Sequence, residues 1–471
     1  AIAGASGSGK TELLRTVAAS VTAGADQAAP CVYGIDAGGG GLTVLERLGS
    51  VGSIVVEQST ERMLRLIRMV HRTVTERNAL LASRGVADLD ALAATGAHVQ
   101  RIHLLIDNLP AVLDALEGGG AMRRQHADQL LTVLQEGRRC GVHVTATAPQ
   151  RTGVPSQILA AFGGRVVMRM SVEDDYTMLG VPSGVLDRES PAGRGLFGPH
   201  EVQVATLGGA GTPLQVERLD ELAAQLGDRY DQASPTSVPV MPTRLPQNVL
   251  PAPQRDELVV GVEQDVVAPV SLRLCDGPVL LTGRARSGRT STLIGLAQLA
   301  RRAESPARVV LVAPLPASDD RASAADLVLT DAAEVSAWAQ AEAARTDREG
   351  WTLVLVDDVH EWERAWDANG DERRALEALA ALLGRPDAAM VVAGDPDELR
   401  SRQHIPGLAA AVKRARRALL ISPEMGDGTL VGAQVPMNSH EPMAGMGRGL
   451  LVAGGQIQVV QLISGGSEER S

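Results

Sequence analysis

The stretch Gly4-Ala5-Ser6-Gly7-Ser8-Gly9-Lys10-Thr11 matches the phosphate-binding pattern G-x-x-x-x-G-K-[ST] at every required position. The apolar residues Ala1-Ile2-Ala3 before it predict a strand, and Thr11–Ala19 after it predicts a helix. Glycines allow successive backbone N–H groups to turn toward a phosphate, and the helix that follows offers its positive N-terminal end. The stretch therefore predicts a phosphate-binding loop, and the alternative is a glycine-rich turn with a structural role only.

The chemistry of this loop predicts ATP and Mg²⁺ as ligands. The Lys10 ammonium is expected to reach the β- and γ-phosphates, and the Thr11 hydroxyl is expected to ligate Mg²⁺. The expected nucleotide-binding residues are Gly4, Ala5, Ser6, Gly7, Ser8, Gly9, Lys10, Thr11 and Glu12.

Length and composition indicate a globular protein of two domains. The chain has 471 residues, of which 44% are hydrophobic and 21% charged. Aromatic residues make up 2%, which leaves little material for stacking on nucleic-acid bases. The net charge of −11 argues against a surface that grips nucleic acid along its length, although a basic loop lining a pore stays compatible with it. The three cysteines follow neither a disulfide nor a metal-binding pattern.

Strands alternate with helices through the first half of the chain. Helical spacing of apolar residues predicts helices over 60–81 and 125–139. Continuous apolar runs predict buried parallel strands at Cys31–Asp36, Val51–Val56, Ile102–Asp107, Val142–Thr147 and Val166–Met170. This alternation predicts an α/β fold with a mostly parallel sheet flanked by helices and with ligands at the carboxyl ends of the strands.

The same order of elements recurs after a proline-rich stretch. We expect a first ATPase domain over 1–227, an extended linker over 228–254 and a second ATPase domain over 255–471. Residue 1 falls inside the strand that feeds the loop, so we expect the N-terminal part of the first domain to be missing. No apolar run long enough to span a membrane and no signal peptide is present in the sequence, which predicts that these residues form a soluble fragment.

Polar residues follow the predicted strands of the first domain. Asp107 ends an apolar strand, where a carboxylate can hold Mg²⁺ through its water shell, or can cap the next helix. Asn108 stands where a water-activating base is usual, and because an amide cannot accept a proton at neutral pH, we expect slow hydrolysis. Gln150 is a candidate γ-phosphate sensor. Arg151 and Arg165 are candidate arginine fingers for a neighbouring subunit, with an ordinary surface charge as the alternative for each.

The second loop, Gly283-Arg284-Ala285-Arg286-Ser287-Gly288-Arg289-Thr290, is degenerate because Arg289 replaces the lysine. Asp357 and Asp358 end the strand Thr352–Val356, as Asp107 ends its own. We expect little or no hydrolysis here, and either bound nucleotide or a role in packing and partner binding. The expected ligand-binding residues are Gly283, Arg286, Ser287, Gly288, Arg289, Thr290, Ser291 and Asp357.

With both copies in view, the chain resembles the FtsK/SpoIIIE class of ATPases, and most of all the tandem-ATPase EccC/EssC motors of type VII secretion. The resemblance rests on both loops, on Arg244-Leu245-Pro246 in the linker, and on these further stretches: Tyr33-Gly34-Ile35-Asp36-Ala37-Gly38-Gly39-Gly40, Val51-Gly52-Ser53, Leu105-Ile106-Asp107, Gly141-Val142-His143, Val356-Asp357-Asp358 and Gly447-Arg448-Gly449.

The resemblance implies RecA/FtsK-like domains in a motor that hydrolyses ATP. It further implies assembly as a hexamer, a membrane anchor upstream of these residues at the cytoplasmic side of the membrane, and substrates that are small helical secreted proteins recognised by their C-terminal tails. A second domain with an impaired loop suits substrate docking or regulation.

Two other readings stay open at this point. A double-stranded DNA translocase would use the same ATP chemistry and would need a basic loop facing a pore, for which Lys413-Arg414-Ala415-Arg416-Arg417 is a candidate. A scaffold that holds nucleotide without turnover is favoured by Asn108 and Arg289.

Overall fold

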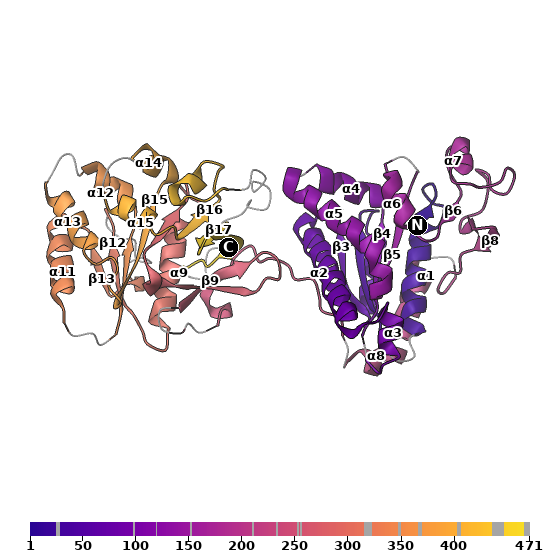
Figure 1. Ribbon diagram of the computed structural model, residues 1–471, viewed down its shortest axis with the longest axis horizontal. Helices are drawn as coiled ribbons and strands as arrows, with labels where there is room; N and C mark the ends of the chain where they lie inside the picture. The colour runs from indigo at the N-terminus through magenta and orange to yellow at the C-terminus, as the bar shows by residue number, and fades with distance from the viewer. Residues whose placement is uncertain are drawn as a thin grey trace. The chain divides into compact units, whose positions relative to one another are not determined.

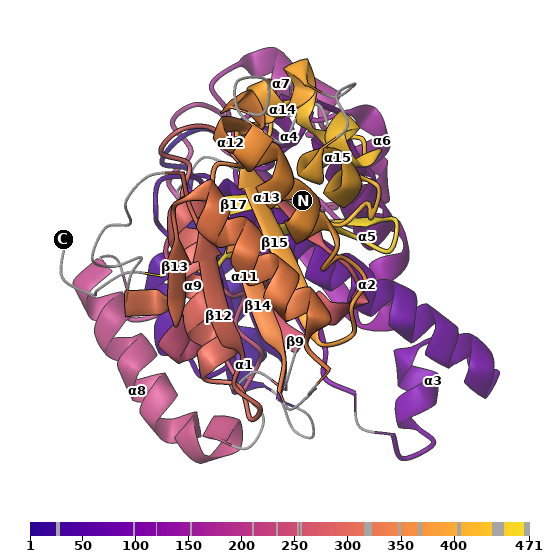
Figure 2. The ribbon, with the colours of Figure 1, turned by 90° about the vertical axis from the view of Figure 1, so that its left-hand side faces the viewer.

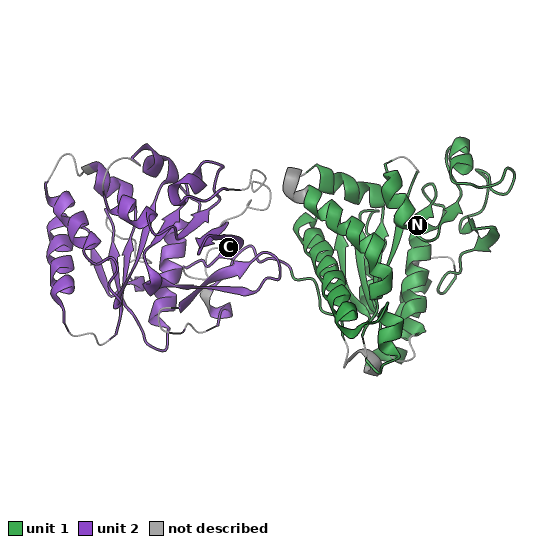
Figure 3. Ribbon diagram, in the orientation of Figure 1, with its two compact units in different colours: residues 1–239 green, residues 240–471 purple. Residues whose placement is uncertain are grey.

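The computed structural model describes most of the chain. The described residues are 1–24, 29–97, 99–118, 120–150, 153–209, 212–231, 234–251, 254, 257–314, 323–346, 350–365, 370–402, 407–435 and 447–465. They form two compact units, residues 1–239 and 240–471, which Figure 3 shows in different colours. No helix among the described residues is long and apolar enough to cross a lipid bilayer.

The first unit is built on an eight-stranded sheet in the order β3-β2-β4-β5-β1-β6-β7-β8. The six strands from β3 to β6 are parallel, and the hairpin β7–β8 adds two antiparallel strands at one edge. The strands are β1 (Ile2–Ala3), β2 (Cys31–Asp36), β3 (Val51–Val56), β4 (Ile102–Asp107), β5 (Val142–Ala148), β6 (Val166–Met168), β7 (Arg194–Phe197) and β8 (His200–Gln203).

Helices cover both faces of this sheet. One face carries α2, α4 and α5, and the other carries α1 and α8, as Figure 1 shows. Their apolar residues form two separate buried clusters, one on each side of the sheet. The helices are α1 (Lys10–Ala23), η1 (Thr43–Arg47), α2 (Thr60–Arg84), α3 (Leu89–Ala93), α4 (Leu109–Glu117), α5 (Gly120–Glu136), η2 (Gly137–Cys140), α6 (Ser156–Ala161), α7 (Glu173–Met178) and α8 (Thr212–Asp231).

The second unit repeats this sheet and extends it. Its ten strands run in the order β10-β9-β18-β17-β16-β11-β15-β14-β12-β13. The six strands from β13 to β16 are parallel, like β3 to β6 of the first unit. The strands are β9 (Glu257–Glu263), β10 (Pro269–Arg273), β11 (Val279–Thr282), β12 (Arg308–Val312), β13 (Leu327–Leu329), β14 (Thr352–Val356), β15 (Ala388–Gly394), β16 (Ala418–Ile421), β17 (Arg448–Ala453) and β18 (Gln456–Leu462).

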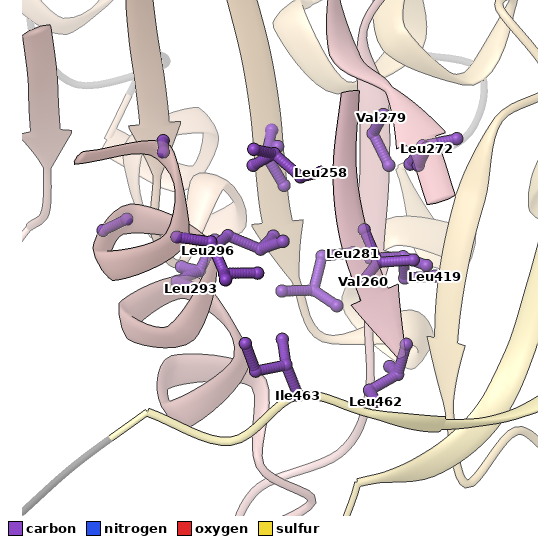
Figure 4. Packing of buried hydrophobic residues seen from close by; sticks show 14 of the residues in the cluster. Leu258, Val260, Leu272, Val279, Leu281, Leu293, Leu296, Leu419, Leu462 and Ile463 are labelled. Carbon is purple, nitrogen blue, oxygen red and sulfur yellow. The ribbon is translucent and has the colours of Figure 1, made fainter. Parts of the chain in front are cut away.

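The core of the second unit also has two layers. On one face α9 packs its Leu293 and Leu296 against β9, β11 and β18, as Figure 4 shows in close-up. On the other face α11, α12, α13 and α15 pack against the parallel strands, and Figure 2 shows α11 and α13 in front of β12, β14 and β15. The helices are η3 (Gln247–Val249), η4 (Leu274–Asp276), α9 (Arg289–Arg301), α11 (Ala332–Ala344), α12 (Val359–Ala365), α13 (Gly370–Ala380), α14 (Pro396–Ser401), α15 (Leu408–Lys413) and η5 (Asp427–Val431).

The proline-rich stretch between the units is mostly extended, and buried side chains along it pack on one unit or the other. On the first unit, the Ser53 hydroxyl accepts from the Val238 amide (2.9 Å), and the guanidinium groups of Arg62 and Arg65 donate to the carbonyls of Val238 and Pro239. On the second unit, buried side chains from the stretch join the core; they are Met241, Leu245 and Leu250. Val240 between these two groups is 68% exposed.

A stacked histidine pair lies at the amino end of β4 and β5 in the first unit. His103 and His143 are partners in the strand register, with ring centroids 5.1 Å apart. Burial lowers the pKa of His103 to about 4, with smaller contributions from His143 and Arg101. Burial also lowers the pKa of His143, and Arg101 and Arg138 add to that effect.

This pair predicts a loss of stability on acidification. In the unfolded chain a histidine titrates near 6.5, so between pH 6.5 and pH 4 the unfolded state binds more protons than the folded state. The stabilising contribution is therefore complete above pH 6.5 and declines as the pH falls toward 4, by about 3 kcal/mol for His103 at most. Urea unfolding at pH 7.5 and pH 4.5 measures the change, and His103→Phe should reduce it. Replacement of the exposed His200 by Gln is the control, and an identical pH dependence in His103→Phe and the parent chain would contradict the assignment.

Candidate nucleotide site

The phosphate-binding loop of the first unit joins β1 to α1 at the carboxyl end of the sheet. Gly7 (φ 71°) and Gly9 (φ 103°) take left-handed backbone conformations that a side chain would strain. A Cβ on Gly9 would also lie 3.0 Å from the backbone nitrogen of Gly193, and that nitrogen donates to the Ser8 carbonyl (2.8 Å). The segment before β7 therefore supports the loop from outside.

Lys10 is the first residue of α1 and lines a cavity of about 480 Å³ at the loop. Its Nζ donates to the Ala5 carbonyl (2.8 Å), so the ammonium lies over the loop. Burial lowers the pKa of Lys10, and the Asp107 carboxylate opposes that change. The cavity is lined by Ser6, Gly7, Gly9, Lys10, Thr11, Glu12, Gly38, Asp107, Asn108, Thr147, Pro149 and Ala192.

A hydrogen-bonded chain links the loop to the ends of β4 and β5. The Thr11 hydroxyl donates to Asp107 Oδ2 (2.7 Å), and the Thr147 hydroxyl donates to Asp107 Oδ1 (2.5 Å). The backbone amide of Asn108 donates in turn to Thr147 Oγ1 (2.8 Å). Asp107 and Thr147 are almost completely buried. The Thr11 hydroxyl and the Asp107 carboxylate are hard oxygen ligands at the cavity wall, so this pair fits Mg²⁺ bound beside phosphate oxygens.

The turn after β2 lies against this pair. Both carboxylate oxygens of Asp36 accept hydrogen bonds from the backbone of the turn. The donors are the backbone amides of Gly38, Gly40 and Leu42. A Cβ on Gly38 would lie 2.7 Å from Asp107 Oδ2, and a Cβ on Gly41 would lie 2.7 Å from Thr11 Cγ2. The run of glycines is therefore required where the turn approaches the two expected metal ligands.

Asn108 has the left-handed conformation (φ 69°) at the start of α4, which suits asparagine better than most residues. Its side-chain amide donates to the Ala37 carbonyl (3.0 Å) and lines the cavity. A side-chain amide can hydrogen-bond a water molecule but cannot take its proton at neutral pH.

Two expected catalytic residues lie outside the cavity. Gln150 is exposed and is not part of the cavity lining, which Thr147 and Pro149 reach instead. Arg165 is exposed at the amino end of β6, beside the terminal amine of Ala1 and at the opposite end of the strand from the loop. Its role toward a neighbouring subunit stays a prediction, and Arg151 lies outside the described residues.

Arg169 is a loop contact that the sequence did not single out. It follows β6 at the carboxyl end of the sheet, and its guanidinium donates to the carbonyls of Gly7 (3.3 Å) and Ser190 (3.4 Å). The strand order places β6 next to β1, which only the three-dimensional structure reveals.

The second loop has the same backbone with different side chains. Gly288 (φ 107°) corresponds to Gly9, and Arg286 (φ 64°) takes the left-handed position of Gly7. Thr290 Oγ1 donates to Asp357 Oδ2 (3.3 Å), as Thr11 does to Asp107. Ser291 follows in the first turn of α9, where its carbonyl accepts from the Gly465 amide (2.8 Å).

Arg289 is engaged by carboxylates of its own unit. Its Nη2 lies 2.8 Å from Asp358 Oδ1, and its Nη1 lies 3.9 Å from Asp395 Oδ2. Its side chain is 13% exposed. The group that replaces the loop lysine is therefore held in an ion-paired cluster, and Asp358, which occupies the position of Asn108, is part of it.

Comparison with known proteins identifies a family that contains this loop. Residues 1–215 match the model of the FtsK/SpoIIIE family. The chain is 27% identical to ESX-3 secretion system protein EccC3 of Mycobacterium tuberculosis over 322 residues, which is 64% of this chain and 23% of that protein. It is 24% identical to ESX-4 secretion system protein EccC4 of the same species over 499 residues, covering 98% of this chain and 38% of that protein. The chain thus spans well under half the length of these relatives.

Solved structures match over the whole chain. EssC (ATPases 2 and 3) of Geobacillus thermodenitrificans has a TM-score of 0.76 at 18% identity, covering 99% of this chain and 91% of that one. Thermomonospora curvata EccC (ATPases 2 and 3), in complex with a signal sequence peptide, has a TM-score of 0.65 at 20% identity, covering 99% and 88%. At these identities the matches show the fold alone: two successive units, each a mostly parallel sheet flanked by helices.

The loop, its facing carboxylate and the parallel sheet define a P-loop ATPase domain. The first unit carries an FtsK/SpoIIIE family domain, and the chain as a whole is a relative of the EccC and EssC ATPases of type VII secretion.

Proposed function

We propose that this chain is a motor module of a type VII-like protein secretion system, in which the first unit binds and slowly hydrolyses Mg-ATP. The observation that carries the proposal is the Thr11–Asp107–Thr147 chain at the wall of the Lys10 cavity. Lys10 would pair with the β- and γ-phosphates, and Thr11 and Asp107 would hold Mg²⁺, which supplies charge neutralisation at these phosphates. Asn108 would orient the attacking water without deprotonating it, which limits the rate.

In this proposal the second unit docks substrate or regulates. Arg289 is paired with Asp358 and Asp395. The cation that takes the position of Lys10 is therefore engaged within its own unit, and so is the carboxylate that takes the position of Asn108. The related EccC chain is described in complex with a signal sequence peptide, which supports a small secreted protein with a C-terminal tail as the partner here. Assembly as a hexamer on a membrane-anchored complex is proposed on the same relationship, with the described residues at the cytoplasmic side.

The alternative, a double-stranded DNA translocase, receives less support. In the basic cluster 413–417, Lys413 donates to the Leu399 carbonyl (2.8 Å), and Arg417 donates to the carbonyls of Gly277 and Arg273. Burial lowers the pKa of both side chains. Two of the four cations are therefore used within the unit instead of forming an open surface for phosphates.

Steady-state ATP hydrolysis with added polymers tests the proposal. We expect slow turnover by the chain alone, no response to double-stranded DNA, and faster turnover with a small helical secreted protein that carries its C-terminal tail. The same protein without its tail is the matched control. Stimulation by DNA with no response to the tailed protein would replace the secretion motor by the translocase.

A further inference from the structure

A buried glutamine from α8 joins the charged residues behind the phosphate-binding loop. The Gln215 side chain is almost completely buried, and it comes from the helix that ends the first unit. Its Oε1 accepts from Arg15 Nη1 (2.8 Å), and its Nε2 donates to the Glu12 carboxylate. Arg15 also pairs with Glu12 (2.7 Å), and its Nε donates to the Gly41 carbonyl (2.7 Å). Two residues of α1 are thus held by α8 and by the turn after β2.

Glu12 places a carboxylate beside the expected phosphate site. It lies in the first turn of α1, next to Lys10 and Thr11, and it lines the cavity that would take the phosphates. The positive N-terminal end of α1 favours an acidic side chain in this turn. A free carboxylate at this wall would repel a nucleotide triphosphate, because like charges separated by a few ångströms near a protein surface interact by kilocalories per mole.

The contacts occupy both oxygens of this carboxylate. Arg15 binds Oε1 and Gln215 binds Oε2, and Arg15 is itself fixed by Gly41. We propose that Gln215 and Arg15 are positioning residues that hold the Glu12 carboxylate away from the nucleotide phosphates, so that α8 forms part of the nucleotide site. This inference rests on the proposed binding of Mg-ATP by the first unit.

The second loop offers an internal comparison. Counted from the loop, Ser291 takes the position of Glu12 and Ile294 that of Arg15. The carboxylate and its guanidinium partner are present together behind the first loop and absent together behind the second. This is expected when the guanidinium serves to control the carboxylate.

Binding of Mg-ATP to the full chain, measured by calorimetry, tests the inference. Gln215→Ala should weaken binding about tenfold with little change in kcat, because Glu12 is released toward the phosphates. Gln215→Glu, which keeps the shape and places a second carboxylate beside Glu12, should weaken it further. The double variant Glu12→Gln/Gln215→Ala should bind as tightly as Glu12→Gln alone. Asp220→Ala, which removes an exposed ion pair of α8 with Arg47 (2.7 Å), is the matched control and should leave affinity unchanged.

Three results would overturn the inference while leaving the proposed function intact. These are unchanged affinity in both Gln215 variants, no recovery in the double variant, or weakened binding in Glu12→Gln itself. The second would show that Gln215 only anchors α8. Absence of Mg-ATP binding by the parent chain would instead overturn the proposed function and the inference together.

Discussion

Lys10→Ala is expected to weaken Mg-ATP binding by roughly 30-fold to 150-fold and to abolish hydrolysis. Lys10 is the cation at the wall of the cavity, and its ammonium is held only by the Ala5 carbonyl among its described hydrogen bonds. Loss of a charge-assisted contact to phosphate costs about 2–3 kcal/mol for binding, and the charge that develops in the transition state adds to that cost. Titration with a fluorescent ATP analogue and a phosphate-release assay measure the two effects.

Arg289→Ala is the matched control in the second loop. Because Arg289 pairs with Asp358 and Asp395 of its own unit, its removal should leave nucleotide binding at the first loop and turnover within about twofold of the parent chain. An equal loss in the two variants would mean that both loops bind nucleotide and act together. Full activity in Lys10→Ala would exclude the first loop as the site.

Thr147→Val is expected to reduce kcat by about tenfold to a hundredfold at nearly constant shape. The Thr147 hydroxyl donates to Asp107 Oδ1 and accepts from the Asn108 amide, and it is 1% exposed. Valine leaves the partly buried backbone amide of Asn108 without its acceptor and frees the carboxylate that would hold Mg²⁺, at a cost of about 1–3 kcal/mol in stability. Steady-state kinetics over a range of Mg²⁺ concentrations should show a higher requirement for the metal.

Thr145→Val is the control for that substitution. Thr145 lies two residues earlier on β5 and therefore on the same face of the sheet, and no hydrogen bond of its side chain to the Asp107 group is present in the described structure. It should retain the kinetics of the parent chain. If both threonine variants lose activity to the same extent, the effect comes from strand packing and the role of the Thr147 hydroxyl is wrong.

Much of the fold could be predicted from local sequence signals. The strands at β2, β3 and β4 begin and end where the apolar runs do, because strands buried on both faces are apolar throughout. The hairpins β7–β8 and β9–β10 were not predicted. Strands β7, β8 and β10 are short and partly exposed, so they carry no continuous apolar run and depend on the neighbours that pair with them. Strand β9 is buried from Leu258 to Val262 and was missed although these residues are apolar except for Gly261.

The candidate site could be predicted only where residues are close in sequence. The loop and Asp107 follow from motif spacing and from the end of an apolar run. Thr147, Arg169 and Gln215 reach the loop from β5, β6 and α8 through the strand order and helix packing, which no local pattern encodes. Gln150 was predicted from its place after β5, yet Thr147 near the end of that strand and Pro149 directly after it line the cavity instead.

The division of the proline-rich stretch has a practical consequence for dissecting the chain. Arg65 donates a hydrogen bond to the Pro239 carbonyl in the first unit, and Met241 is buried in the core of the second. The side chain of Val240, between these two residues, is exposed and packs in neither core. A protease recognition sequence inserted at Val240 would leave each half of the stretch attached to the core that it completes. Cuts placed by composition alone, at 227 or 254, would remove Val238 from one hydrophobic cluster or Met241 and Leu245 from the other.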